Sequence, residues 1–318
     1  MHKYILKRIL MLIPVIFGVS LLVFCIMNVA SGDVTAVMGA EELDAQQLYE
    51  LKESLGLNDP LLVRYVKYMW NLITKGDLGT GYISKEPVMS LFLNRFPNTL
   101  KLALGSTLVC VILSIPLGIY SAVHHGSIAD NVAMVGALLG LSIPNFWLGL
   151  VLIVIFALRL GWLPSEGAVG FKSIILPAIT IGTGFMASMT RVTRSSMLDV
   201  IRSDYLRTAR AKGAPERQVI YKHALKNALI PIITSIGETF ATALGGAVVT
   251  EAVFSWPGVG RLIIDSIRSR DTMVVVGCII MKTIVISVIL LIVDILYAFV
   301  DPRIKSHYAR ARKAKIDE

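Results

Sequence analysis

Long apolar stretches separated by polar segments give this chain its pattern. A helix needs about 20 mostly apolar residues to cross about 30 Å of hydrocarbon. Six stretches are long enough by that rule, or nearly so, at residues 9–30, 100–123, 134–158, 174–189, 229–253 and 274–300. Prolines lie inside several of them, which bundles of membrane helices tolerate. The pattern predicts an all-α integral membrane protein with six transmembrane helices.

The segment 31–98, between the first two spans, has a pattern typical of short amphipathic helices. Leu48, Leu51 and Leu55 follow the capping residue Asp44 at helical spacing, and Gly56 is placed to end that helix. The segment is also rich in acidic residues. We expect a helical segment outside the membrane.

A second helix is expected in the same segment, between Asn58-Asp59-Pro60, a cap with a first-turn proline, and a stop at Lys75-Gly76. The glycine-rich run 76–81 must then be a tight loop. Two interpretations of the whole segment stay open: a lid over the bundle, or a docking or gating surface for an external partner. The apolar face of the second helix, which we expect to be buried, consists of Leu62, Val66, Met69, Trp70 and Ile73.

Basic residues gather at 3–8, 191–228 and 301–318. Positively charged loops stay in the cytoplasm, and six spans put both termini on one side, so all three regions are expected in the cytoplasm. The net charge of +9, in a chain with 55% hydrophobic residues, therefore reflects membrane topology. Nucleic-acid binding is not expected, because no aromatic residues interleave with the basic ones to stack on bases.

The first span follows basic residues, as the core of a secretory signal does. At residues 9–30 it is longer than the usual core of about 7–15 residues. Asn28-Val29-Ala30 is also a poor cleavage site. We interpret residues 1–30 as a cytoplasmic tip and an uncleaved first transmembrane helix, residues 99–300 as the transmembrane core, and residues 301–318 as a basic cytoplasmic tail.

The sequence offers no group of residues suited to catalysis or metal binding. Cys25, Cys110 and Cys278 lie far apart, in or beside spans, with neither metal-ligand spacing nor a disulfide framework. The five histidines are scattered, and no nucleophile–base set, HExxH or phosphate-binding G-x-x-x-x-G-K-[ST] stands out. We expect no catalytic residue, no metal and no cofactor on this chain.

The basic segment 191–228 contains a helix–turn–helix pattern. Ser203 or Asp204 is placed to cap a helix that runs to Lys212, Gly213 to leave it in a left-handed conformation, and Pro215 to start the next helix. A solvated basic loop would need no such turn. We expect the second helix to continue directly into the fifth span.

The small side chains of Thr208, Ala209 and Ala211 would let the first of these helices lie deep in a groove of another protein. Together with the charged residues around them they predict a contact element on the cytoplasmic side. Its residues are Asp204, Tyr205, Arg207, Thr208, Ala209, Arg210, Ala211, Lys212, Gly213 and Glu216.

Short motifs follow one another in a fixed order over nearly the whole chain. They are Gly18-Val19-Ser20, Gly76-Asp77-Leu78-Gly79, Phe96-Pro97-Asn98-Thr99-Leu100, Ser142-Ile143-Pro144-Asn145-Phe146-Trp147, Asp204 to Gly213, His223-Ala224-Leu225-Lys226-Asn227-Ala228, Glu251-Ala252-Val253-Phe254-Ser255-Trp256-Pro257-Gly258-Val259-Gly260 and Asp301-Pro302-Arg303-Ile304. Each is weak alone. As an ordered set they make the chain resemble the permease subunits of the dipeptide, oligopeptide and nickel class of ABC importers.

The resemblance implies a type I importer in the inner membrane of a prokaryote. Two related permeases would form the path, two ATPase subunits would bind ATP and Mg below, and an extracytoplasmic binding protein would deliver substrate above. The segment 204–226 would be the coupling element that inserts into the ATPase. Arg207-Thr208-Ala209 stands where the wider superfamily has Glu-Ala-Ala, and His223-Ala224-Leu225-Lys226 replaces its Ile-x-Leu-Pro ending, while the helix–Gly–helix arrangement is kept.

Within this class, di- or oligopeptides are the expected substrates, and nickel or other metal chelates and glutathione are alternatives. A secondary transporter is more remote, because the halves of the sequence show no inverted repeat. An intramembrane enzyme would need a nucleophile–base or metal constellation in the spans. Transport that requires a separate ATPase chain would distinguish the importer from both.

Charged residues inside the spans are candidates for the translocation path. A carboxylate at mid-membrane costs about 2.5–3.5 kcal/mol on insertion scales, so Glu238 should face water or a partner, not lipid. Two interpretations of Glu238 stay open: it lines the path and helps to pass positively charged groups, or it makes a structural contact with the second permease. Pro144 and Asn145 are further candidates for the path. Asp294 in the last span is expected to make a structural contact, with Lys282 as a candidate partner.

Overall fold

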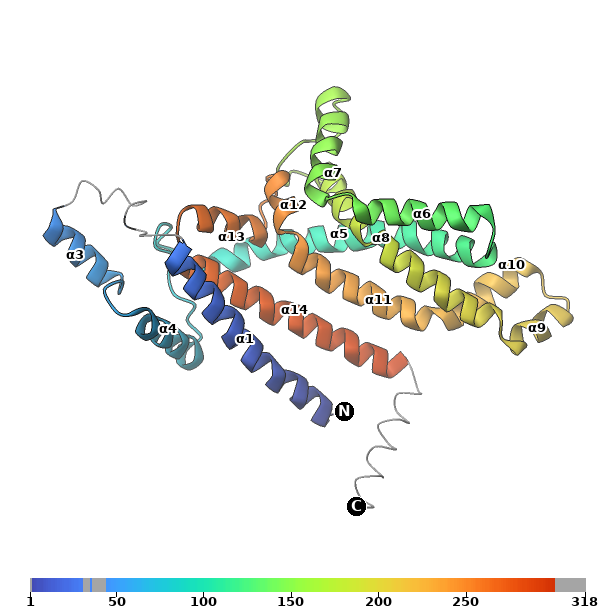
Figure 1. Ribbon diagram of the computed structural model, residues 1–318, viewed down its shortest axis with the longest axis horizontal. Coiled ribbons are helices and arrows are strands. Elements are labelled where there is room, and N and C mark those ends of the chain that lie inside the picture. The colour runs from blue at the N-terminus through green and yellow to red at the C-terminus, as the bar shows by residue number, and fades with distance from the viewer. Residues whose placement is uncertain (1, 31–34, 36–43, 301–318) are drawn as a thin grey trace, which may run out of the picture. The chain divides into compact units, whose positions relative to one another are not determined.

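The computed structural model describes residues 2–30, 35 and 44–300, and its regular elements are helices (Figure 1). The chain divides into two compact units. One comprises residues 1–101, 166–168 and 247–287, and the other residues 102–165, 169–246 and 288–318. The predicted tail 301–318, with its motif Asp301-Pro302-Arg303-Ile304, lies outside the described residues, as does most of 31–43.

Five helices are long and apolar enough to cross a membrane, and a bent pair makes up to six. The all-α membrane fold predicted from the apolar pattern is thereby confirmed. Compared with the predicted spans, α5 begins earlier and α8 ends later, so that residues 191–201 are helix and not loop. The five helices are α1 (His2–Ala30), α5 (Val88–Val123), α8 (Lys172–Ile201), α11 (Leu225–Gly246) and α14 (Thr272–Val300).

The predicted span 134–158 is a bent pair of helices. It consists of α6 (Ile128–Ser142) and α7 (Asn145–Leu152), which continues as the π-helical turn η2 (Ile153–Arg159), and the two arms are bent by 95°. Ile143 has an extended ψ of 122°. A proline disfavours helical backbone in the residue before it, so Pro144 breaks the span instead of being tolerated within it.

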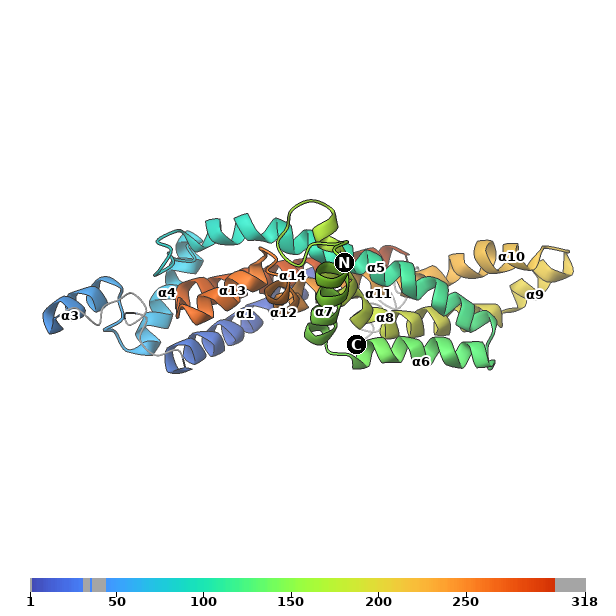
Figure 2. The ribbon, with the colours of Figure 1, turned by 90° about the horizontal axis from the view of Figure 1, so that it is seen from above.

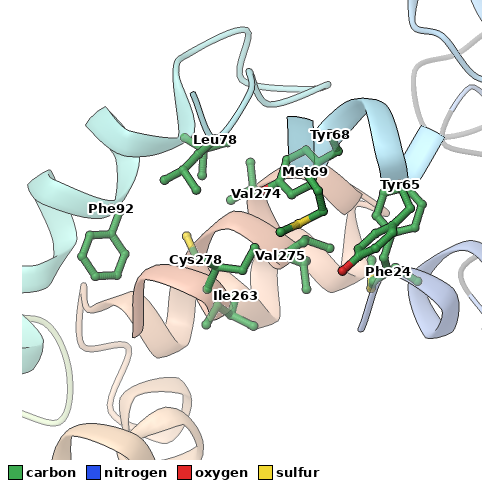
Figure 3. Close-up of a cluster of buried hydrophobic side chains, with 14 of the residues drawn as sticks. Phe24, Tyr65, Tyr68, Met69, Leu78, Phe92, Ile263, Val274, Val275 and Cys278 are labelled. Atoms are coloured by element: carbon green, nitrogen blue, oxygen red, sulfur yellow. The ribbon is translucent and has the colours of Figure 1, made fainter. Parts of the chain in front are cut away.

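In the first unit, a buried cluster joins α1, α14 and the outer segment (Figure 3). That segment contains α3 (Ala45–Ser54) and α4 (Leu61–Lys75), and the unit also holds α12 (Val248–Val253) and α13 (Val259–Arg268). Buried members of the cluster include Phe24, Tyr65, Tyr68, Met69, Leu78, Phe92 and Val275. The cluster fixes the outer segment to the membrane helices of its unit.

Both predicted outer helices are present. Asp44 caps α3 by accepting a hydrogen bond from the amide of Gln47 at 2.7 Å, and Gly56 follows with a φ of +66°. Gly76 ends α4 with a φ of +65°, and Gly79, with a φ of +81°, belongs to the tight loop expected there.

The buried face of α4 differs from the predicted one. Tyr65, Tyr68 and Met69 are buried, and Tyr65 binds α1, where its hydroxyl lies 2.9 Å from Ser20 Oγ and donates to the carbonyl of Phe17 at 3.1 Å. Of the residues expected inside, only Met69 is buried, because tyrosines with a polar tip face α1. The exposed ones are Leu62 (66%), Val66 (63%), Trp70 (67%) and Ile73 (64%).

In the second unit, α8 packs against α6 and α11 (Figures 1 and 2). Between α8 and α11 the chain forms α9 (Asp204–Ala211), α10 (Glu216–Gln218) and the π-helical turn η3 (Val219–Ala224). Figure 1 shows these short elements at one end of the unit, beyond the ends of α8 and α11. The basic segment is therefore held between two long helices.

Candidate functional site

A short helix, α9, occupies the centre of the basic segment, as predicted. Ser203 precedes it with an extended backbone, but its hydroxyl donates to the carbonyl of Val200 at 2.5 Å and does not cap the helix. Asp204 is the first helical residue, where the helix dipole favours a carboxylate. The helix ends at Ala211, one residue before the predicted end.

The turn after α9 depends on Gly213, which has a φ of +78°. Its amide donates to the carbonyl of Arg210 at 2.9 Å, and the amide of Ala214 donates to that of Ala209 at 3.2 Å. A Cβ at Gly213 would meet no atom within 4 Å. The requirement for glycine thus comes from the left-handed backbone and not from lack of space.

Three contacts fix α9 to the elements after the turn. Leu206 is fully buried in a cluster with residues of η3, α8 and α11. Arg210 binds both carboxylate oxygens of Glu216, from Nε at 3.0 Å and from Nη2 at 2.8 Å, and this pairing raises the pKa of Arg210. Asn227 on α11 donates to the hydroxyl of Tyr205 at 2.7 Å. The helix–turn–helix is therefore one rigid piece.

Most of the predicted contact residues lie on an exposed face of this piece. The side chains of Asp204 and Arg207 are 98% and 81% exposed, and Thr208, Ala211 and Lys212 are exposed as well. Ala209 is different, because it packs against the cluster around Leu206. The expected small-residue face is thus divided. Ala209 packs inside the loop, whereas Thr208 and Ala211 remain exposed to a partner.

The second helix of the pair is not continuous. Only α10 is α-helical, and η3 inserts a π-helical turn before α11 begins at Leu225. The buried side chains Val219, Ile220 and Ala224 come from this turn. Single π-turns are rare and occur frequently at functional sites. No period in the sequence distinguishes this turn from ordinary helix, so sequence analysis missed it.

A buried ion pair near this site was also missed. Asp130 on α6 is 2% exposed and accepts two hydrogen bonds from Arg194 on α8. The hydroxyl of Ser121, the amide of Gly126 (3.0 Å) and the ring of His125 (3.4 Å) surround the same carboxylate. From the sequence, Arg194 was only one of the positive charges in the basic segment 191–228. The structure places it on the helix that carries α9.

The candidate path residues lie apart from this loop. Glu238 is exposed on α11, where its backbone carbonyl accepts from Thr242 at 2.8 Å. Pro144 is exposed at the bend, and Asn145 lies against α8, because a Cβ on Gly184 would be 2.9 Å from its Oδ1. No hydrogen bond or ion pair joins Glu238 to the other two in the part of the chain that the structure describes. A role in transport remains a prediction for all three.

Asp294 is half-buried on α14, and its structural role remains a prediction too. Lys282 on the same helix interacts electrostatically with Glu251, an acidic residue that sequence analysis did not consider as its neighbour. Glu251 itself belongs to one of the sequence motifs. The contacts of Glu251 connect this motif, 251–260, with the motif 96–100.

Glu251 is fully buried and joins the motifs at 96–100 and 251–260. Thr99 Oγ1 donates to its Oε1 at 2.7 Å, and the amide of Arg261 donates to its Oε2 at 3.0 Å. Thr99 in turn accepts from the amide of Val259 at 2.8 Å. These contacts fix the start of α13 to α5 at Thr99.

The binding-protein-dependent transport system inner membrane component family matches residues 114–306, and the N-terminal family of the same systems matches residues 1–103. The oligopeptide transport system permease protein AppB of Bacillus subtilis (strain 168) is 42% identical over 316 residues, covering 96% of this chain and all of that one. The glutathione transport system permease protein GsiC of Escherichia coli (strain K12) is 41% identical over 305 residues, covering 96% and 99%.

A solved structure of the MetNI methionine ABC transporter in an inward-facing conformation superimposes with a TM-score of 0.59 at 21% identity, covering 68% of this chain and 99% of that chain. A likeness at this identity supports the fold. It agrees with the helical membrane architecture described above.

Proposed function

Because the chain belongs to the family of binding-protein-dependent transport system inner membrane components, we propose that it forms half of the path of an ATP-driven importer and couples it to ATPase subunits through residues 204–226. The observation that carries this assignment is the rigid, basic helix–turn–helix with its exposed face. ATP hydrolysis would belong to the partner subunits and not to this chain.

The contacts around α9 suggest how the loop acts. Closure of two ATPase subunits would displace the exposed face of α9. Leu206 and the Arg210–Glu216 pair connect α9 to the helices after it, so the displacement would pass to α8 and α11 as a movement of rigid elements. Differential contacts with the two ATPase states would then shift the bundle between inward- and outward-facing arrangements.

The assembly we propose contains a second related permease, two ATPases and an extracytoplasmic binding protein. Both termini and the segment 191–228 would face the cytoplasm, as the distribution of Lys and Arg suggests. The segment 31–98 would then meet the binding protein.

We propose di- or oligopeptides as the substrate. The relative named for oligopeptide transport and the relative named for glutathione transport are almost equally similar, so glutathione is the second candidate. Nickel and other metal chelates are a third. Because the permeases are so alike, we expect selectivity to reside largely in the binding protein.

Reconstitution in proteoliposomes tests the function. The chain, a second permease, the ATPases and the binding protein should together accumulate labelled di- or oligopeptides when ATP is supplied to the ATPase side, and omission of the ATPases should abolish uptake. Uptake without the ATPases, driven by an ion gradient, would instead identify a secondary transporter. Parallel assays with glutathione and a nickel chelate, and the mass of the ligand that co-purifies with the binding protein, decide the substrate.

A further inference from the structure

The outer helix α4 is bound to α1 within the part of α1 that crosses the membrane. The hydroxyl of Tyr65 lies 2.9 Å from Ser20 Oγ and donates to the carbonyl of Phe17 at 3.1 Å. Ser20 Oγ also lies 3.8 Å from the sulfur of Met69, one helical turn further along α4. Two successive turns of α4 thus meet the same position of α1.

The position of Ser20 in its span gives the depth of this contact. The apolar window of α1 runs from Leu10 to Val29, and Ser20 is the eleventh of its 20 residues. At about 1.5 Å per residue, Ser20 lies about 14 Å from the end at Val29, in a hydrocarbon layer about 30 Å thick. The contact therefore lies near the middle of the span, whichever end faces the cytoplasm.

Further contacts lie between this point and the outer segment. Phe24, one turn after Ser20, meets Tyr65 edge to face with ring centroids 5.6 Å apart, and stacks with Tyr68 at 6.4 Å (Figure 3). These residues belong to the buried cluster of the first unit. The helix α4 is thus fixed beside the half of α1 that leads to the outer segment, and not beyond its end.

Three faces of α4 have different surroundings. One packs into the buried cluster through its tyrosines. A polar face carries Arg64, Lys67 and Asn71, which line a cavity together with the loop 77–82. The remaining face is apolar, and each of its side chains is 63–67% exposed: Leu62, Val66, Trp70 and Ile73.

The depth of α4 identifies what covers this apolar face. With 15 residues, α4 is about 22 Å long and too short to span the bilayer. Helices that lie in the plane of the membrane interface have an apolar face toward the acyl chains and a polar face rich in Lys and Arg, and tryptophan is enriched at this level. On α1, Leu22 and Ile26 are 58% and 53% exposed, so α1 also leaves apolar surface to lipid near the contact with α4.

We propose that α4 is embedded in the outer leaflet, with its apolar face against lipid acyl chains and its polar face toward the extracytoplasmic surface. The outer segment then lies partly within the membrane, and not wholly outside it as its sequence pattern suggests. The helix α3 and the loop after α4 remain available to the binding protein. Lipid contact at α4 requires the membrane fold, but it does not depend on the proposed transport function.

Nitroxide labels on introduced cysteines test the proposal in the full-length chain, reconstituted with its partner subunits in lipid nanodiscs. Cys25→Ser removes the partly exposed native thiol, and the other two cysteines are buried and do not compete for the label. Val66→Cys on the apolar face and Lys67→Cys on the polar face are neighbouring exposed positions, and Leu22→Cys on α1 is the lipid reference.

The quantity measured is the rate of collisions with oxygen, which concentrates in hydrocarbon, relative to that with a water-soluble nickel complex. This ratio should be several times higher at position 66 than at position 67, and similar to that at position 22. Frequent collisions with the nickel complex at position 66 would place the apolar face in water. Rare collisions with both reagents would show that another protein chain covers it, and either result overturns the proposal.

Trp70 provides a second measurement that needs no label. Lipids brominated along their acyl chains should quench the fluorescence that Trp70→Phe removes, whereas a water-soluble quencher should have little effect on it. The reverse order of quenching would also overturn the proposal. Neither measurement involves uptake, so a failure here and a failure of the proposed function are distinguishable.

Discussion

Arg194 binds both carboxylate oxygens of Asp130 across 64 positions of sequence, from Nε to Oδ1 at 2.8 Å and from Nη2 to Oδ2 at 2.7 Å. The pair joins the start of α6 to the part of α8 that leads into α9. The carboxylate is almost completely buried. The pair makes α6 part of the element that the proposed coupling loop would move.

Removing one member of this pair should destabilise the protein severely. Arg194→Met leaves a buried carboxylate without its cation, which costs about 3–5 kcal/mol. The thermal midpoint in detergent should fall clearly, whereas Arg191→Met, at an exposed position on the same helix, should leave it nearly unchanged. The double variant Arg194→Met, Asp130→Leu should recover much of the loss, because no charge is left buried. A single variant as stable as the wild type would contradict the assigned burial.

A side chain at Gly213 should uncouple ATP hydrolysis from uptake. Valine disfavours the φ of +78° by more than the roughly 1–2 kcal/mol that an ordinary residue loses there. We expect Gly213→Val to assemble with its ATPases but to transport poorly. Gly56→Val imposes the same backbone strain in the outer segment, at a φ of +66°, and should retain coupling. Normal transport by Gly213→Val would show that the turn is not part of the lever.

The contact between the two motifs around Glu251 should be sensitive to a single methyl group. A Cβ on Gly260 would lie 2.6 Å from the Cα of Val248 and 2.9 Å from Glu251 Oε2. Gly260→Ala should therefore lower stability by about 1–3 kcal/mol, as overpacking does. Gly246→Ala, where a Cβ meets nothing within 4 Å, is the matched control for thermal unfolding. Equal midpoints for the two variants would rule out this close approach.

Glu238→Gln tests the proposed path. The amide keeps the shape of the side chain and removes its charge, so uptake of peptides with a positive amino terminus should fall while assembly is preserved. The measurement is initial uptake in proteoliposomes for differently charged peptides over a range of pH. Unchanged uptake throughout would make Glu238 a structural residue and assign the path to others.

Deletion of α3 tests the outer segment as a docking surface. No residue of α3 is buried, so its removal with a short linker should leave the fold intact. Docking of the binding protein should weaken while the ATPases still bind, as co-purification can show. Undiminished docking would show that α3 is part of a lid and does not contribute to the docking surface.

The sequence predicts the spans because a long apolar run has few alternatives to a membrane helix. It predicts the turn at Gly213 because the glycine and the following proline agree locally, although the predicted side-chain cap at Ser203 is not formed. It mistakes the role of Pro144, since a proline that breaks a helix and one that a bundle tolerates look alike in sequence. Asp130 and Arg194 are joined only by the fold, and no local pattern reports such a pair.

The outer helix α4 shows a further limit of pattern analysis. The spacing of apolar residues along α4 identifies an apolar face. In a membrane protein that face need not point inward, and here the tyrosines occupy the inner side of the helix. As a result α4 is apolar on both faces: Tyr65 and Met69 toward α1 and α14, Val66 and Trp70 toward the exterior.

This has a practical consequence. A recombinant fragment containing only the outer segment would expose both apolar faces of α4 to water at once and would self-associate. Pull-downs or titrations with such a fragment would detect nonspecific hydrophobic association instead of specific recognition. The segment can be assayed only within the intact chain, in lipid or detergent.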